Sequence, residues 1–214
     1  MSHYFTTPEG VEKRREISAT IWEREHGFVT ANGVFSGSRL DPATALLFDE
    51  LTAPPDGSRL LDLGCGYGPI AVALAAQCPS SVVDAVDVNQ RALALAAENA
   101  ARIGAAERVH TLLPEQADPA TRYDEIWSNP PIRIGKPALH ELLLTWLARL
   151  APQGRAVMVV GKNLGADSLQ RWLVEQSYDC QRLASHKGFR ILEARASGIP
   201  VQPDTTVQPD TTVE

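Results

Sequence analysis

The feature that most constrains the fold is a regular alternation of short apolar segments and helical segments through the middle of the chain. Apolar runs rich in Leu and Val predict buried strands, and each is followed by a segment with helix-like spacing. Strands are predicted at 59–64, 81–88, 108–113, 123–128 and 154–161, with helices at 69–77, 90–104, 138–150 and 166–176. Because parallel strands need crossover connections, this alternation predicts a Rossmann-like, doubly wound and mostly parallel α/β sheet.

The last two predicted strands break this pattern. They cover 178–184 and 189–195, and only four residues separate them. A connection that short cannot carry a crossover helix, so the two strands are expected to form an antiparallel C-terminal hairpin at the end of the sheet.

The residues before the first core strand predict a small β-rich N-terminal appendage. Residues 15–36 alternate like a strand with a break at Gly27, and Asp41-Pro42 supplies the N-cap and first residue of a helix. The chain ends with VQPDTT repeated twice, a composition that cannot bury a core and predicts a disordered tail. The predicted divisions are a hairpin-plus-helix appendage at 1–55 packed on the core, the main domain at 56–198 and the tail at 199–214.

The composition excludes several classes of protein. The net charge of −6 argues against a generally cationic nucleic-acid binder, and no apolar run is long enough to span a membrane. The N-terminal segment lacks the apolar stretch of a signal peptide, and the three cysteines have no metal-binding or disulfide spacing. These features predict a cytoplasmic protein with no metal site. The charge is uneven, since 131–190 holds nine Lys/Arg and four Asp/Glu, which indicates either an anionic partner or solvated helix faces.

A glycine-rich loop, LLDLGCGYG, joins the first predicted core strand to its helix. Its glycines, Gly64, Gly66 and Gly68, allow a tight turn and a close approach of the backbone to a ligand. Asp87 ends the next strand, where an acid can hold the ribose hydroxyls of an adenosine. Asp62 lies beside the loop and would repel a pyrophosphate, but it suits a ligand with an ammonium and a sulfonium, as in S-adenosyl-L-methionine. The alternatives are a helix-capping or turn carboxylate at Asp62 and an ordinary strand-end acid at Asp87.

The stretch SNPP ends the predicted strand 123–128. In a doubly wound sheet this tip borders the crevice beside the glycine loop. Asn129 and the carbonyl of Pro130 would present hydrogen-bond acceptors, because proline has no N–H of its own. Two acceptors can bind the N–H bonds of a conjugated amine and orient its nitrogen for attack on an electrophilic methyl. The alternative is a rigid loop with no part in chemistry.

The combination of DLGCGYGP, AVDVN and SNPPIRIGK resembles the class I S-adenosylmethionine-dependent methyltransferases of the small-domain group. Within that group it is similar to the ribosomal small-subunit RNA guanine methyltransferases, which modify the exocyclic 2-amino group, and to their single-domain relatives. The similarity runs from HYF at 3–5, through 33–47, to KGFRIL at 187–192.

The resemblance implies a role for each matching position. The methionine part of the cofactor would lie against Asp62 and the loop glycines, and Asp87 would hold the ribose. Asn129 and Pro130 would orient the amine. Phe35 and Thr44 would close over the methionine end, and Pro131 and Ile132 would contact the acceptor. Arg133 and Lys136 would contact phosphates, and the alternative for these two residues is ordinary surface charge. His186, Lys187 and Arg190 would extend that basic patch.

The chain departs from the family pattern at two places. Ile132 stands where many of these enzymes carry an aromatic residue that stacks on a flat substrate. No clear acid for the adenine follows the third strand, and Glu115 is only a candidate. The expected function is methyl transfer from S-adenosyl-L-methionine to an exocyclic amine, with guanine of ribosomal small-subunit RNA as the favoured acceptor. Methylation of a protein glutamine or a small-molecule amine, a binding module without turnover and a nicotinamide-dependent oxidoreductase are the alternatives.

Overall fold

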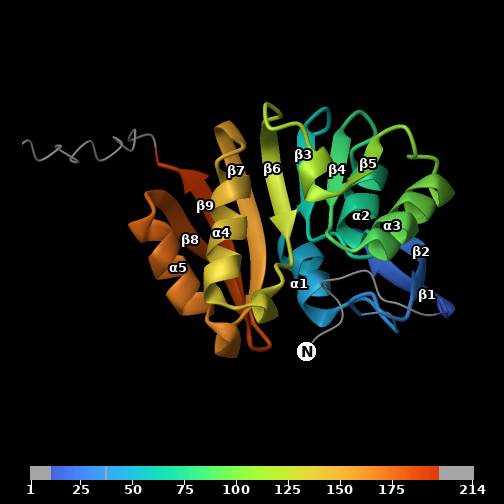
Figure 1. Cartoon of the computed structure of the whole chain (residues 1–214), viewed down its shortest axis with the longest axis horizontal. Coiled ribbons are helices and arrows are strands. Elements are labelled where there is room, and N and C mark those ends of the chain that lie inside the picture. Colours follow the sequence, from blue (N-terminus) through green and yellow to red (C-terminus); the bar gives the residue numbers. More distant parts are fainter. Residues whose placement is uncertain (1–10, 37, 198–214) are drawn as a thin grey trace, which may run out of the picture.

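The computed structural model describes residues 11–36 and 38–197, so both the HYF motif and the expected tail lie outside the described residues. Its main sheet has seven strands in the order β5-β4-β3-β6-β7-β9-β8 (Figure 1). These strands are β3 (Arg59–Leu63), β4 (Val82–Val86), β5 (Val109–Leu112), β6 (Tyr123–Ser128), β7 (Leu150–Gly161), β8 (Tyr178–His186) and β9 (Phe189–Ala196). The helices are α1 (Pro42–Glu50), α2 (Pro69–Gln77), α3 (Gln90–Arg102), α4 (Lys136–Leu147) and α5 (Ala166–Glu175).

The strand pairing confirms the predicted fold class. β3 pairs in parallel with both β4 and β6, and β7 continues the parallel sheet beyond β6. β9 lies antiparallel between β7 and β8, which is the predicted C-terminal hairpin. The chain builds the sheet outward from β3 in one direction and then from β6 in the other, so the strand order reverses between β3 and β6. In open α/β sheets such a reversal opens a crevice at the carboxyl ends of the strands.

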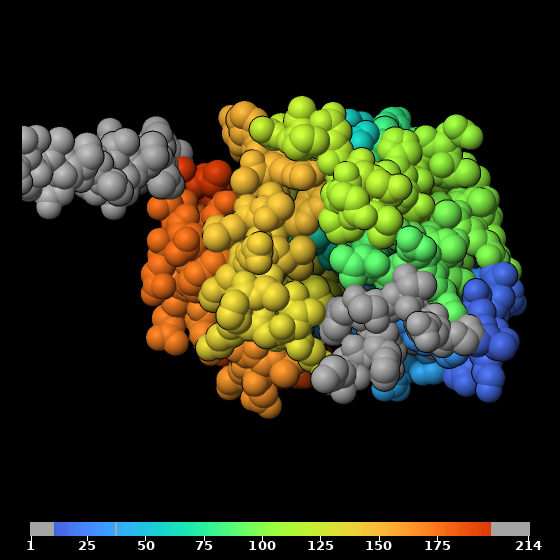
Figure 2. Space-filling view, viewed as in Figure 1, coloured from blue at the N-terminus to red at the C-terminus, as the bar shows by residue number. Residues whose placement is uncertain are grey.

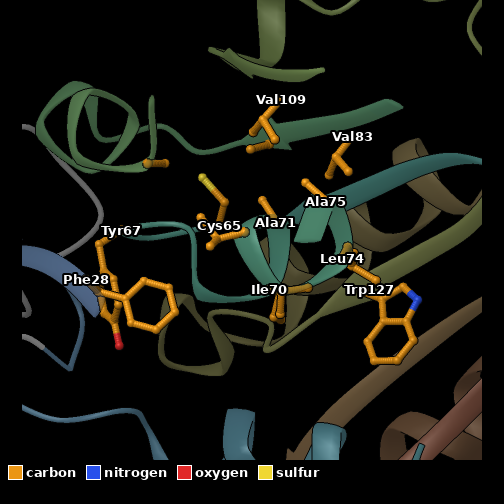
Figure 3. Close-up of a cluster of buried hydrophobic side chains, with 14 of the residues drawn as sticks. Phe28, Cys65, Tyr67, Ile70, Ala71, Leu74, Ala75, Val83, Val109 and Trp127 are labelled. Carbon is orange, nitrogen blue, oxygen red and sulfur yellow. The ribbon is translucent and has the colours of Figure 1, made fainter. Parts of the chain in front are cut away.

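Alternate side chains of the sheet pack into two hydrophobic cores, one on each face. Leu60 of β3 packs into one core with α1, α2 and α3, whereas Leu61 and Leu63 pack into the other with α4 and α5. This is the result expected for a strand buried on both faces, since successive side chains point to opposite sides. Figure 3 shows the first core, where α2 presents Ile70 and Leu74 to the sheet.

The N-terminal residues form a separate two-stranded sheet of β1 (Arg14–Ile21) and β2 (Arg24–Ala31). The predicted break at Gly27 is wrong, because β2 runs straight through that residue and pairs it with Ser18. The turn instead lies at Trp22 and Glu23, which adopt positive φ angles of 46° and 67°. Such a two-residue turn normally uses Asn or Gly. Here the Trp22 indole is held by packing and by a 2.8 Å hydrogen bond from Nε1 to the Leu51 carbonyl.

A buried asparagine ties this hairpin to helix α3 and to the glycine loop. Asn99 of α3 accepts from the Val29 amide at 2.7 Å and donates to the Val29 carbonyl at 2.9 Å. Its side-chain nitrogen also donates to the Tyr67 carbonyl at 2.9 Å, in the glycine loop. The side chain of Asn99 therefore links the hairpin to the glycine loop. The division into an appendage at 1–55 and a main domain at 56–198 stays a proposal.

Predicted element boundaries differ from the observed ones by a few residues. The first helix has the predicted N-cap, since the Asp41 side chain accepts from the Ala43 and Thr44 amides, but it ends at Glu50 rather than near 53–57. α4 begins at Lys136, two residues early, because Pro137 occupies its first turn. Within the described residues, the structure contains no helix of the length and apolarity needed to cross a membrane.

Candidate functional site

A cavity of about 520 Å³ opens at the carboxyl ends of β3, β4 and β6. In Figure 2 a hollow lies between the yellow surface of α4 and the green surface that follows β4 and β5. The lining combines the glycine loop, the end of β4 and the diproline segment. It includes Phe35, Asp41, Gly64, Gly66, Asp87, Asn129, Pro130, Pro131, Ile132, Arg133, Leu164 and Phe189.

Not every predicted site residue reaches this cavity. Thr44 lines a smaller adjoining cavity of about 30 Å³, which shares Phe35 and Asn129 with the larger one. Asp62 is fully buried beneath the loop, and Lys136 is exposed but does not line the cavity. Glu115 is exposed outside the lining, although Pro114 beside it contributes.

The glycine loop has a left-handed backbone, which glycine adopts without strain. All three predicted glycines have positive φ, and Gly68 at 83° forms the N-terminal end of α2. A Cβ at Gly68 would lie 2.9 Å from the Cβ of Ala96, so helix α3 packs directly against the loop. The Gly64 and Cys65 amides donate to the Val86 carbonyl at 2.8 and 3.0 Å, which anchors the loop to β4. The loop is therefore held in place before any ligand binds.

Asp62 lies under this loop with one carboxylate oxygen unpaired. Its Oδ2 accepts from the Ala71 amide at 2.9 Å, whereas Oδ1 has no partner among the described residues. Burial raises the pKa of Asp62 to about 8, opposed by the Ala71 hydrogen bond and reinforced by the charge of Asp87. With that pKa the carboxyl is mostly protonated at neutral pH. A cation nearby would favour its ionised form and a phosphate its protonated form, so the site would suit an ammonium or a sulfonium better than a pyrophosphate.

Asp87 stands at the cavity edge at the end of β4. Its two oxygens accept from the Gly66 and Asn89 amides, each at 2.9 Å, and burial raises its pKa. A carboxylate can accept about four hydrogen bonds, so it keeps acceptor sites for ribose hydroxyls. Beside it, Val88 and Pro114 add apolar surface to the lining, with half of Val88 exposed. This apolar surface suits a flat ring, and no local motif marks either residue.

The diproline segment lies against the glycine loop. Ser128 donates to the Leu63 carbonyl at 2.7 Å, and a Cβ at Gly64 would lie 3.8 Å from Cδ of Pro131. The predicted free carbonyl of Pro130 is wrong, because it accepts from the Ile132 amide at 2.8 Å. The cause is the backbone of Pro131, whose φ of −75° and ψ of 69° form an inverse γ-turn. One lone pair of that carbonyl oxygen remains available.

Asn129 at the tip of β6 is bound to helix α1. Its Nδ2 donates to Asp41 Oδ1 at 2.9 Å and to the Thr44 hydroxyl at 3.0 Å. The sequence predicts Asp41 only as a helix cap, so its contact with Asn129 is a functional candidate that sequence reasoning missed. The two residues are 88 positions apart, and no local pattern links them.

The basic residues around the cavity mouth divide into paired and exposed ones. Arg190 does not extend a free patch as expected, because it is buried and its Nε lies 2.6 Å from Asp167 Oδ1. His186 and Lys187 are exposed at the β8–β9 turn. Lys162, which the sequence analysis did not single out, is also exposed, and its amide donates to the Gly188 carbonyl at 2.8 Å.

The strand order, the glycine loop and the strand-end acid together define a Rossmann-like, S-adenosylmethionine-dependent methyltransferase fold. Residues 25–193 match the family described as "Methyltransferase small domain". The chain belongs to this family.

Three similar proteins extend this assignment. The "Uncharacterized protein YbxB" of Bacillus subtilis strain 168 is 31% identical over 196 residues, which cover 90% of this chain and 98% of that protein. The "Ribosomal RNA small subunit methyltransferase C" of Ectopseudomonas mendocina is 36% identical over 173 residues, 78% of this chain but 50% of that one. A structure of a T. thermophilus 16S rRNA N2 methyltransferase (RsmC), in complex with AdoMet and guanosine, has a TM-score of 0.74 at 26% identity and covers 87% and 52% of the two chains. The chain thus spans about half the length of these two methyltransferases.

Proposed function

We propose that this protein transfers a methyl group from S-adenosyl-L-methionine to the exocyclic 2-amino group of guanine in ribosomal small-subunit RNA. The observation that carries the proposal is a single cavity lined by Gly64, Asp87 and Asn129. A cofactor held by the first two residues and an amine held by the third would share one enclosed space. The similarity to ribosomal RNA methyltransferases supports the acceptor.

The chain's own residues bind and orient the reactants. Gly64, Gly66 and Asp87 would hold the cofactor, with Asp62 and Gly68 supporting the loop beneath it. The cofactor would supply an electrophilic methyl, and the C–S bonding pair would stay with sulfur as the new N–C bond forms. Asn129 accepts an N–H of the amine through Oδ1, and the remaining lone pair of Pro130 accepts the other. These acceptors stabilise the positive charge that develops on nitrogen. The proton then lost from nitrogen passes to water, so no strong base is needed.

The acceptor half of the cavity suits a flat base. Ile132 and Leu164 are apolar, and Phe189 from β9 brings an aromatic ring to the same lining. Phe189 thus supplies the aromatic surface that Ile132 lacks, and single-stranded bases commonly stack on such rings. Arg133 lines the cavity and is exposed, Lys162 is exposed next to the lining residue Gly161, and Lys187 is exposed two residues before Phe189. Cations at these positions can bind the phosphates that flank a target nucleotide.

A labelled-methyl assay tests this function. The protein is incubated with tritiated S-adenosylmethionine and three substrates from a strain that lacks it: small ribosomal subunits, naked ribosomal RNA and the protein fraction. Label in RNA, recovered after digestion as N2-methylguanosine, is the expected result. Asn129→Ala should lower the labelling rate about 100- to 1000-fold to a measurable residual rate, and Asn163→Ala, at an exposed position outside the lining, is the matched control. Label in methylated glutamine of the protein fraction alone would refute the RNA acceptor.

A further inference from the structure

The side-chain amide of Asn129 is held by two residues of one helix. Asp41 Oδ1 receives Nδ2 at 2.9 Å while also accepting from the Ala43 and Thr44 amides at 2.9 and 3.1 Å. The Thr44 hydroxyl, on a side chain that is 96% buried, receives the second N–H at 3.0 Å. Both N–H bonds of Asn129 therefore point toward α1. No donor among the described residues contacts its Oδ1.

The carboxylate of Asp41 favours one orientation of the amide over the other. An ionised carboxylate accepts hydrogen bonds but cannot donate one. If the Asn129 amide rotated by 180°, its oxygen would face the Asp41 oxygen, and a hydrogen bond would become a repulsion. The observed arrangement instead keeps Oδ1 on the side away from α1, and Asn129 lines the large cavity.

We propose that Asp41 and Thr44 are positioning residues that keep the oxygen of Asn129 directed at the acceptor amine. The inference rests on the proposed function. An amide free to rotate would present its NH₂ to the amine for part of the time and lose the acceptor. The charge of Asp41 also polarises the Asn129 amide, because hydrogen bonds in a chain strengthen one another. This makes Oδ1 a stronger acceptor for the charge that develops during transfer.

Three substitutions separate this role from helix capping. Asp41→Ser keeps a good N-cap but is too short to reach Asn129, so kcat should fall about 10- to 100-fold. Asp41→Asn also caps, and its amide oxygen can stay where Oδ1 accepts all three hydrogen bonds, so its loss should be smaller. Thr44→Val removes one acceptor at constant shape and should lie between the two. In all three variants kcat should fall by a larger factor than the KM for S-adenosylmethionine changes.

Two further measurements distinguish positioning from a general structural effect. In the Asn129→Ala background, Asp41→Ser should cause no additional loss of kcat, because its partner is gone. The side-chain NMR signals of Asn129, identified by their absence in Asn129→Ala, should shift in Asp41→Ser and Thr44→Val. Asp49→Ser, at an exposed position on the same helix, is the control and should leave those signals and kcat unchanged.

The outcomes separate the two proposals. Unshifted Asn129 signals in Asp41→Ser, or an equal loss of kcat in the Asn129→Ala background, would overturn the positioning role. A shift of those signals in a protein that methylates no acceptor would uphold the contact and refute the proposed function. The NMR readout needs no bound cofactor.

Discussion

An alanine at Gly68 would place its Cβ 2.9 Å from the Cβ and 3.1 Å from the Cα of Ala96, at a φ of 83°. A left-handed backbone costs a non-glycine residue ~1–2 kcal/mol, and overpacking adds ~1–3 kcal/mol. The stiffer unfolded chain offsets ~0.4–1 kcal/mol. Gly68→Ala should therefore lower the free energy of unfolding by about 3 kcal/mol, which corresponds to a fall of about 6–12 °C in Tm for a domain of this size.

Urea unfolding followed by circular dichroism measures this loss of stability. Two further variants separate its backbone contribution from its steric contribution. Gly57 has the same kind of backbone, with φ 84°, but no atom within 4 Å of an added Cβ. Gly57→Ala should lose only the backbone part, ~1 kcal/mol. Ala96→Gly in the Gly68→Ala background should recover part of the steric cost, although the Ala96 Cα stays close. Equal losses in Gly57→Ala and Gly68→Ala would refute the claim that α3 restricts the loop.

Three other predictions test the site and its support. The raised pKa of Asp62 makes its ionisation unfavourable in the folded protein, so the free energy of unfolding should fall as pH rises from about 4 toward 8. Urea titrations at several pH values measure this dependence, and Asp62→Asn should flatten it. Leu74→Ala in the fully buried core should cost ~2–5 kcal/mol of stability, and a loss below 1 kcal/mol would contradict tight packing around α2. Lys162→Glu with Lys187→Glu should weaken RNA binding and reduce its salt dependence in filter binding, whereas Arg171→Glu on α5 should not. If RNA affinity depended on salt concentration equally in the lysine variants and the wild type, the cavity mouth would not be a phosphate-binding surface.

Much of the fold could be predicted because its signals are local. The strand–helix alternation depends on spacing within each segment, and the Asp41-Pro42 cap and the glycine loop depend on the φ that each residue permits. The hairpin turn at Trp22 could not be predicted in this way. Neither turn residue is Gly or Asn, and packing of the indole on Phe48 and Trp127 holds it in place.

Partner choice around the cavity was also beyond local reasoning. A count of basic residues treats Arg190 and Lys187 alike, although one is paired with Asp167 and the other is exposed. The carbonyl of Pro130 was expected to be free because the motif shows no competing donor. The ψ of Pro131 bends the chain so that the next N–H meets that carbonyl.

The sequence by itself determined the fold class and the cofactor class and predicted an amine-binding corner, because each depends on residues that lie close together along the chain. The tertiary structure decided which distant groups meet. Asp41 and Asn129 come together because α1 packs on β7, the neighbour of β6, and so brings its N-terminal end to the tip of β6. Contacts of this kind depend on how the elements pack, and the residue types alone do not encode them.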